Sequence, residues 1–191
     1  MAKKIHGGVV YLQGVIASII RQYNKEKDTK EAKETLLTAN RIVAVSGGFD
    51  PVHIGHLRMF QQARLLGDKL VVILNNDAWL KRKKGKAFMT QDERAEIIRG
   101  FACVDDVYII QNKKEDHVVT GLRMVQPDIF ANGGDRKDEN DIPEYAHCEA
   151  NGIRMVFGVG GGKIQSSSDL IKNSKSNKGP GRYNKKYPIK K

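Results

Sequence analysis

Two histidines separated by two residues, His53 and His56, carry the strongest chemical signal in the sequence. They close the run Gly-Gly-Phe-Asp-Pro-Val-His-Ile-Gly-His, which lies between an apolar, strand-like run at 42–45 and a helix-like run at 57–66. The turn from a strand into a helix is where doubly wound folds bind phosphate, because the free N–H groups of the helix face it. Each imidazole can donate a hydrogen bond to a phosphate oxygen and supplies charge when protonated. The pattern favours a phosphate site over a tight turn with two solvated histidines.

Three more polar segments follow strand-like runs and would reach the same edge of a sheet. The run 81–86 holds five basic residues, the turn 132–135 reads Asn-Gly-Gly-Asp, and three serines stand at 166–168. Basic side chains, and hydroxyl and amide groups at a helix start, can hold phosphate groups. The alternatives are a solvated charge run, a turn aspartate and simple helix capping.

From residue 41 onward the hydrophobic pattern alternates between strand and helix. Apolar strands between amphipathic helices indicate a parallel sheet covered on both faces. We therefore expect an α/β fold, a Rossmann-like doubly wound parallel sheet of five strands, with an N-terminal helical extension and a basic C-terminal tail. The expected strands are 42–45, 69–74, 106–110, 127–131 and 153–157, and the expected helices are 55–66, 91–101, 116–125, 143–150 and 167–173. Thr90 and Glu93 predict a capping box on the second helix.

The distribution of charge divides the chain into three parts. The net charge is +11, yet residues 41–171 carry eighteen basic and eighteen acidic residues, while residues 172–191 carry eight basic residues and no acidic one. We expect a helical extension at 1–40, one chemically active domain at 41–172, and a disordered tail at 173–191. The extension would cover part of the core or form a homodimer contact. Nucleic acid binding through the tail is the less favoured alternative.

Cysteine usage and hydropathy bear on the compartment. Cys103 and Cys148 are far apart and form no CxxC pair, so neither a disulfide framework nor a zinc site is expected. The apolar stretch 9–20 is shorter than the roughly twenty residues that a membrane span needs. No clear small-residue cleavage site follows it. The sequence predicts a cytoplasmic protein without a membrane partner.

The run at 47–56 resembles the HxGH signature of the cytidylyltransferase-like nucleotidyltransferases. The likeness covers residues 41–172 in the family's order, including the strand and N-x-D end at 66–77, the basic loop at 81–85, and the turn at 132–135 with Asn in place of Lys. These enzymes join a nucleoside triphosphate to a phosphorylated acceptor and release pyrophosphate. The resemblance implies direct in-line attack on the α-phosphate of ATP or CTP.

Three branches of the family share features with the chain. The segments 66–85 and 132–135 look most like those of the heptose-1-phosphate adenylyltransferases, and glycerol-3-phosphate cytidylyltransferases share most of them. The sequence at 49–53 resembles that of the pyridine-nucleotide adenylyltransferases, but the later segments of the chain match those enzymes poorly. A sugar- or polyol-phosphate acceptor is therefore expected, with ATP or CTP left open. The alternative is a non-catalytic nucleotide- or RNA-binding module on the same fold.

The resemblance also assigns roles to individual residues. It implies that the catalytic residues are His53, His56 and Lys84. The register of the lysines stays open, because Lys81 and Lys84 match one subfamily and Lys83 better matches another. It implies nucleotide contacts from Gly48, Phe49, His53, Gly55, His56, Ser166, Ser167 and Ser168. It implies substrate contacts from Lys81, Lys83, Arg94 and Asp135, although Arg94 could also be an ordinary helix-surface arginine. Asp50 is expected to hold the turn rather than orient a histidine. Mg²⁺ should arrive with the triphosphate, so no dedicated metal ligands are expected.

Overall fold

The computed structural model describes residues 40–111, 117–133, 143–161 and 165–175. The strands in these ranges are β1 (Ile42–Gly47), β2 (Lys69–Leu74), β3 (Asp106–Ile109), β4 (Ile129–Gly133) and β5 (Arg154–Val159). The helices are α3 (Ile54–Arg64), α4 (Asp77–Lys84), α5 (Gln91–Arg99), α6 (Val118–Val125), α7 (Tyr145–Ala150) and α8 (Ser167–Lys175). None of the described helices is long and apolar enough to cross a membrane. The expected N-terminal extension and most of the expected tail lie outside the described residues.

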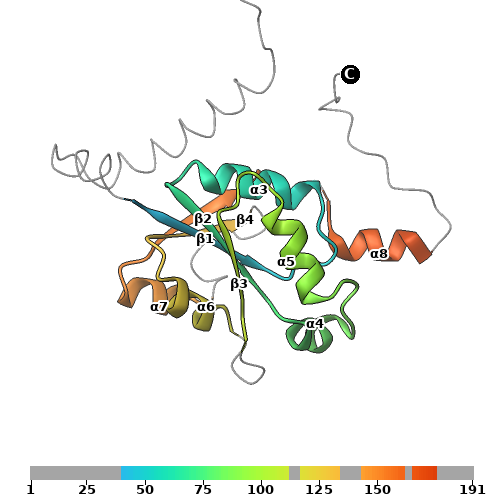
Figure 1. Cartoon of the computed structure of the whole chain (residues 1–191). Helices are drawn as coiled ribbons and strands as arrows, with labels where there is room; N and C mark the ends of the chain where they lie inside the picture. Colours follow the sequence, from blue (N-terminus) through green and yellow to red (C-terminus); the bar gives the residue numbers. More distant parts are fainter. Residues whose placement is uncertain (1–39, 112–116, 134–142, 162–164, 176–191) are drawn as a thin grey trace, which may run out of the picture. The chain divides into compact units, whose positions relative to one another are not determined.

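The strands form one parallel sheet in the order β3-β2-β1-β4-β5. Helices α3 and α5 lie over one face of the sheet, and α6 and α7 lie over the other (Figure 1). This confirms the expected α/β, Rossmann-like fold. From β1 the chain adds β2 and then β3 on one side of the sheet. It then crosses back to place β4 and β5 on the other side of β1. In such sheets the ligand crevice opens at this reversal, beyond the carboxyl ends of the strands.

A close-packed apolar core holds the helices against the sheet. Ile73, Leu122 and Phe130 are completely buried in one cluster between the sheet and α6. Gly121 lets α6 approach closely, because a β-carbon added there would lie 2.4 Å from the side chain of Ile73. The core therefore fixes the sheet whose carboxyl edge carries the polar segments.

Residues 77–84 form a helix, and the expectation of a basic loop there was wrong. Asn76 caps α4, because its side chain accepts a hydrogen bond from the backbone N–H of Trp79 at 2.9 Å. Gly85 ends the helix in the left-handed conformation, with a φ of 81°. Leu80 is fully buried and anchors the helix. The charged composition conceals this short helix, whose stability comes from packing rather than from its own periodicity.

Candidate active site

His53 and His56 lie together at the start of α3. The Nδ1 atom of His53 accepts a hydrogen bond from the backbone N–H of Gly55 at 3.1 Å. The Nδ1 atom of His56 accepts from the backbone N–H of His53 at 3.2 Å, which completes a reciprocal cap. An imidazole nitrogen that accepts a hydrogen bond carries no proton, so Nδ1 is the acceptor in each ring. The nitrogen of each ring that can act as a donor is therefore Nε2.

The surroundings of His56 keep this ring neutral. Its pKa falls from 6.5 to about 3, mainly because the ring is buried, and further because His53 and Lys84 lie nearby and disfavour a positive charge on it. The rings of the two histidines stack with 3.6 Å between centroids. Phe49 meets His56 edge-on at 4.9 Å. At neutral pH His56 can thus donate a hydrogen bond without contributing charge.

The loop between β1 and α3 packs tightly against α3 and α4. Phe49 is only 5 % exposed, packs on Phe60 at 5.1 Å between centroids, and takes a positive φ of 47°. A β-carbon on Gly48 would lie 2.9 Å from the side chain of Leu80 in α4. The tight fit lets the backbone of this loop approach α4 where a larger side chain would push it away.

Asp50 ties the histidine loop to the segment before α5. Its side chain is fully buried, and its two carboxylate oxygens accept hydrogen bonds from the backbone N–H groups of Phe88 and Met89, each at 2.8 Å. The contact confirms the expected turn-holding role. The Nζ atom of Lys84 donates to the backbone carbonyl of Asp50 at 3.3 Å. Burial lowers the pKa of Lys84, an effect that the charge of Asp50 opposes. Lys84 is therefore one cation that the fold brings to the histidine loop.

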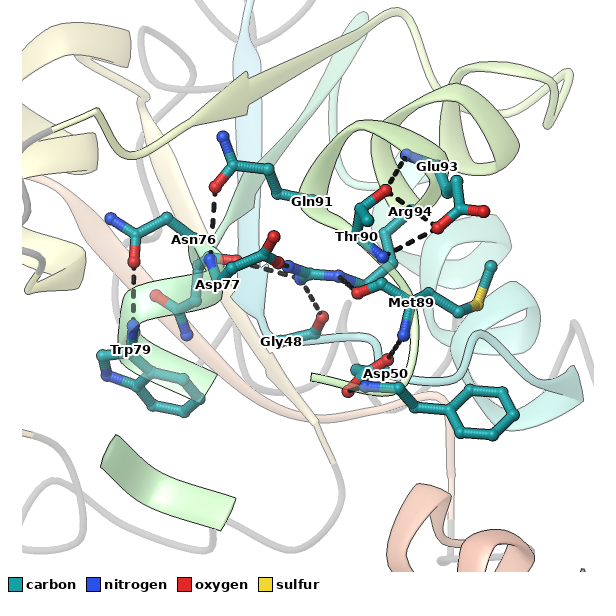
Figure 2. Close-up of polar contacts among 12 residues, drawn as sticks. Gly48, Asp50, Asn76, Asp77, Trp79, Met89, Thr90, Gln91, Glu93 and Arg94 are labelled. Carbon is teal, nitrogen blue, oxygen red and sulfur yellow. Dashed lines mark hydrogen bonds and ion pairs between the residues drawn. The ribbon is translucent and has the colours of Figure 1, made fainter. Parts of the chain in front are cut away.

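Arg94 is a buried junction between the loops of the site (Figure 2). Its guanidinium is fully buried and donates to the backbone carbonyls of Gly48 at 2.6 Å, Asn75 at 2.9 Å and Met89 at 3.2 Å. It also pairs with the Asp77 carboxylate at 2.6 Å. The alternative of an ordinary helix-surface arginine was wrong. The expected contact of Arg94 with substrate stays a prediction, because most of its donors already hold the protein together.

The other basic and hydroxyl residues occupy distinct positions. Lys83 lies over the ring of Trp79, with its Nζ atom 4.5 Å from the ring centroid. Lys81 faces a pocket between α4 and α5. The Ser167 hydroxyl donates to the backbone carbonyl of Pro51 at 3.0 Å, which joins the start of α8 to the histidine loop. Ser166 caps α8 by accepting from the N–H of Asp169 at 3.4 Å.

The cytidylyltransferase-like family model matches residues 44–156, which include both histidines and Lys84. The chain belongs to this family. Membership places it among the nucleotidyltransferases. The histidine loop and α4 lie within the residues that match this family.

Curated relatives share this part of the chain. Bifunctional protein HldE of Pelobacter propionicus is 41% identical over 134 residues, which are 69% of this chain and 26% of that protein. Bifunctional protein HldE of Campylobacter concisus is 34% identical over 159 residues, covering 81% of this chain and 32% of that protein. The chain thus spans about a third or less of the length of these relatives.

A solved structure shows the same fold. The lipopolysaccharide core biosynthesis protein from Thermoplasma volcanium superposes with a TM-score of 0.53 and 24% sequence identity. The match covers 61% of this chain and 94% of that protein. At this identity the likeness concerns the fold alone.

Set in this family, the predicted site divides into two groups. His53, His56 and Lys84 converge with Ser167 on the loop between β1 and α3. Gly48 and Phe49 belong to that loop, and Gly55 lies in the first turn of α3. Ser168 is exposed on α8, Lys83 stacks on Trp79, and Lys81 lies apart in its own pocket. Asp135 lies outside the described residues.

Asn76 and Gln91 were not singled out from the sequence, although both help to position the site. Asn76 caps α4 and also donates to the carbonyl of Ile110 at 2.9 Å. Gln91 accepts from the N–H of Asp77 at 3.2 Å. For Asn76 a signal existed, because an Asn directly before a run that ends in Gly is typical of a capped helix. For Gln91 the sequence offers none, since its partner is set by tertiary structure.

Proposed function

We propose that the protein transfers the nucleotidyl group of ATP or CTP to the phosphate of a phosphorylated sugar or polyol and releases pyrophosphate. The observation that carries the proposal is the pair of stacked histidines at the start of α3, each with Nδ1 accepting from a backbone N–H group, which makes Nε2 the donor nitrogen of each ring. Family membership supports the reaction class. The mechanism, the nucleotide and the acceptor are the parts that experiment must test.

The chemistry requires an acceptor phosphate oxygen in line with the α-phosphorus and stabilisation of the charge that develops there. Positioning and electrostatics do most of this in phosphoryl-type transfers, without a covalent intermediate. His53 and His56 would donate from Nε2–H to phosphate oxygens, and the N-terminus of α3 adds its partial positive charge. Lys84 would supply the full positive charge that the neutral His56 lacks. Ser167 would hold α8 against the loop while its neighbours face the triphosphate.

Mg²⁺ enters the proposal as the companion of the triphosphate. Within the described ranges, no group of three or more His, Cys, Asp or Glu side chains could hold a metal ion. Mg²⁺ is commonly held through substrate phosphates with few protein ligands. The ion would neutralise phosphate charge, while the chain's own side chains position the reactants.

The acceptor class rests on the resemblance of segments 66–85 and 132–135 to the heptose-1-phosphate adenylyltransferases. The two curated relatives reported above, both named bifunctional protein HldE, support the choice of this part of the family. We therefore propose a sugar 1-phosphate, rather than a polyol phosphate, as the preferred acceptor. ATP and CTP stay as alternatives for the nucleotide.

The test is pyrophosphate release from ATP and from CTP, each with heptose 1-phosphate and with glycerol 3-phosphate. Two variants of His56 separate its two nitrogens. His56→Asn keeps an acceptor near the Nδ1 position and deletes the outer donor, whereas His56→Gln keeps an amide donor near the Nε2 position. We expect turnover to fall in the order wild type, His56→Gln, His56→Asn. Equal turnover in wild type and His56→Asn would refute the role of this donor. Tight nucleotide binding without turnover by any pair would favour the binding module.

A further inference from the structure

A cavity lies between the first turns of α4 and α5, at the same edge of the sheet as the histidine loop. It has a volume of about 460 Å³ and lies beyond the carboxyl ends of β2 and β3. Its polar lining includes Lys81, Gln91, Asp92 and Gln111, and Ala78 and Ile110 give it an apolar part. This size is within the range of small-molecule sites. We call it the α4–α5 pocket.

The pocket is structurally connected to the histidine loop. Asp77 lines the pocket and pairs with Arg94, whose Nη1 atom donates to the carbonyl of Gly48 in that loop. Figure 2 shows Gln91 and Asp77 on one side of this junction and Asp50 on the other. Asp77, Lys81 and Lys84 are spaced four and three residues apart, so they follow one face of α4. The face leads from the pocket to the contact between Lys84 and Asp50.

The distance along this face matches an extended acceptor. Seven residues of α-helix, from Asp77 to Lys84, rise by about 10 Å. A seven-carbon sugar attached to a phosphate near Lys84 is long enough to reach Lys81 and the pocket. A three-carbon polyol phosphate bound in the same way is shorter and would leave the pocket empty.

The charge of the pocket favours hydroxyl groups over a second phosphate. Asp77 is already neutralised by Arg94, and the remaining ionic side chains, Lys81 and Asp92, carry opposite charges. Gln91 uses its Oε1 atom to accept from the N–H of Asp77, which leaves its amide NH₂ available. Carboxylate, amide and ammonium groups together offer both donors and acceptors, as a polyhydroxylated ligand requires. The apolar surface of Ala78 can cover its C–H groups.

We infer that the α4–α5 pocket binds the sugar hydroxyls of the acceptor and so selects a long sugar phosphate over a short polyol phosphate. The inference rests on the proposed function for the position of the acceptor phosphate. Lys81 is then a specificity-determining residue, whereas Lys84 acts at the phosphates.

Steady-state kinetics of the full chain test the inference. Lys81→Ala and Gln111→Ala should each raise the KM for heptose 1-phosphate about five- to tenfold, as expected for one lost hydrogen bond. The KM for the nucleotide and the kinetics with glycerol 3-phosphate should stay within about twofold. Lys69→Ala is the matched control, because it removes the same charge from an exposed site at the amino end of β2. Equal effects on the two acceptors, or no effect on either, would overturn the inference.

A binding measurement separates failure of the pocket from failure of the proposed function. Heptose 1-phosphate added to the full chain without nucleotide should shift the side-chain amide NMR signals of Gln91 and Gln111, and Lys81→Ala should weaken the shifts. NMR shifts without turnover would support sugar binding in the α4–α5 pocket and refute the proposed nucleotidyl transfer. Turnover without shifts of the amide signals would support the proposed nucleotidyl transfer and refute sugar binding in the α4–α5 pocket.

Discussion

The imidazole rings of His53 and His56 stack with their planes 19° apart and each accepts a backbone hydrogen bond through Nδ1. The start of α3 is thus capped by the same side chains that would bind phosphate. This dual use fixes the direction in which the Nε2–H groups point. It also implies that substitutions at either histidine affect the helix as well as the chemistry.

The ring of His56 should stay neutral with its proton on Nε2 well below pH 6.5. Burial is the main reason that its pKa falls to about 3. Two-dimensional ¹H–¹⁵N NMR of the imidazole nitrogens should show the Nε2–H form unchanged between pH 8 and pH 5. A transition near pH 6.5 at His56 would contradict the buried, acceptor-bound Nδ1 atom.

The same pKa makes stability depend on pH. Below pH 6.5 the unfolded chain protonates His56, while the folded chain does so only near pH 3, so the unfolded state binds more protons in this window. The free energy of unfolding should therefore fall on acidification, with His56 contributing at most about 2 kcal/mol between pH 7 and pH 5. Urea denaturation at both pH values should show a smaller pH effect in His56→Asn than in wild type.

Replacing Arg94 by lysine should destabilise the fold strongly. One ammonium group cannot reach Gly48, Asn75, Met89 and Asp77 together, and breaking a buried ion pair costs about 3–5 kcal/mol. The partial exposure of Asp77 puts the expected loss near the lower end. Arg99→Lys on the same helix is the control, since among the described residues the Arg99 side chain donates one hydrogen bond, to the carbonyl of Val107 at 3.1 Å. Similar urea midpoints for the two variants would exclude the junction role.

Asp50→Asn should loosen the loop that Lys84 contacts. The amide would place an NH₂ group against the N–H of Phe88 or Met89, at a cost of about 1–3 kcal/mol for the unsatisfied buried group. Turnover should fall with it, because Lys84 docks on the backbone of Asp50. Asp68→Asn controls for the loss of an aspartate that accepts a backbone N–H, here that of Arg41 at 2.8 Å. Unchanged kcat and melting temperature in Asp50→Asn would refute this coupling.

Replacing Lys84 should lower kcat far more than replacing its neighbour Lys83. Lys84→Ala removes the cation beside the histidine loop and should lower kcat about a hundredfold or more, in line with the loss of one preorganised charge. Lys83→Ala loses the contact with Trp79, which is worth about 0.5–1 kcal/mol of stability. A larger kcat loss for Lys83→Ala than for Lys84→Ala would show that Lys83, and not Lys84, acts at the phosphates.

The strands could be predicted from composition because their buried runs are largely apolar; in β2, residues 70–74 are all apolar and lie between Lys69 and Asn75. The capping box of α5 was equally readable, since Thr90 and Glu93 act on their own helix, and both hydrogen bonds are present. Helix α4 escaped notice because only Leu80 is buried in it, which leaves no repeat for a hydrophobic pattern to reveal.

The sequence by itself determined the local order of the molecule: the parallel strands, the helix that begins at the histidines, and the polar segments at one edge. These depend on side-chain spacing and caps within a few residues. Tertiary structure decided that Arg94 is buried, that Asp50 reaches Phe88 and Met89, and that Lys84 rather than Lys83 meets the histidine loop. Such contacts join residues tens of positions apart, and the packing of α4 and α5 against the sheet sets them.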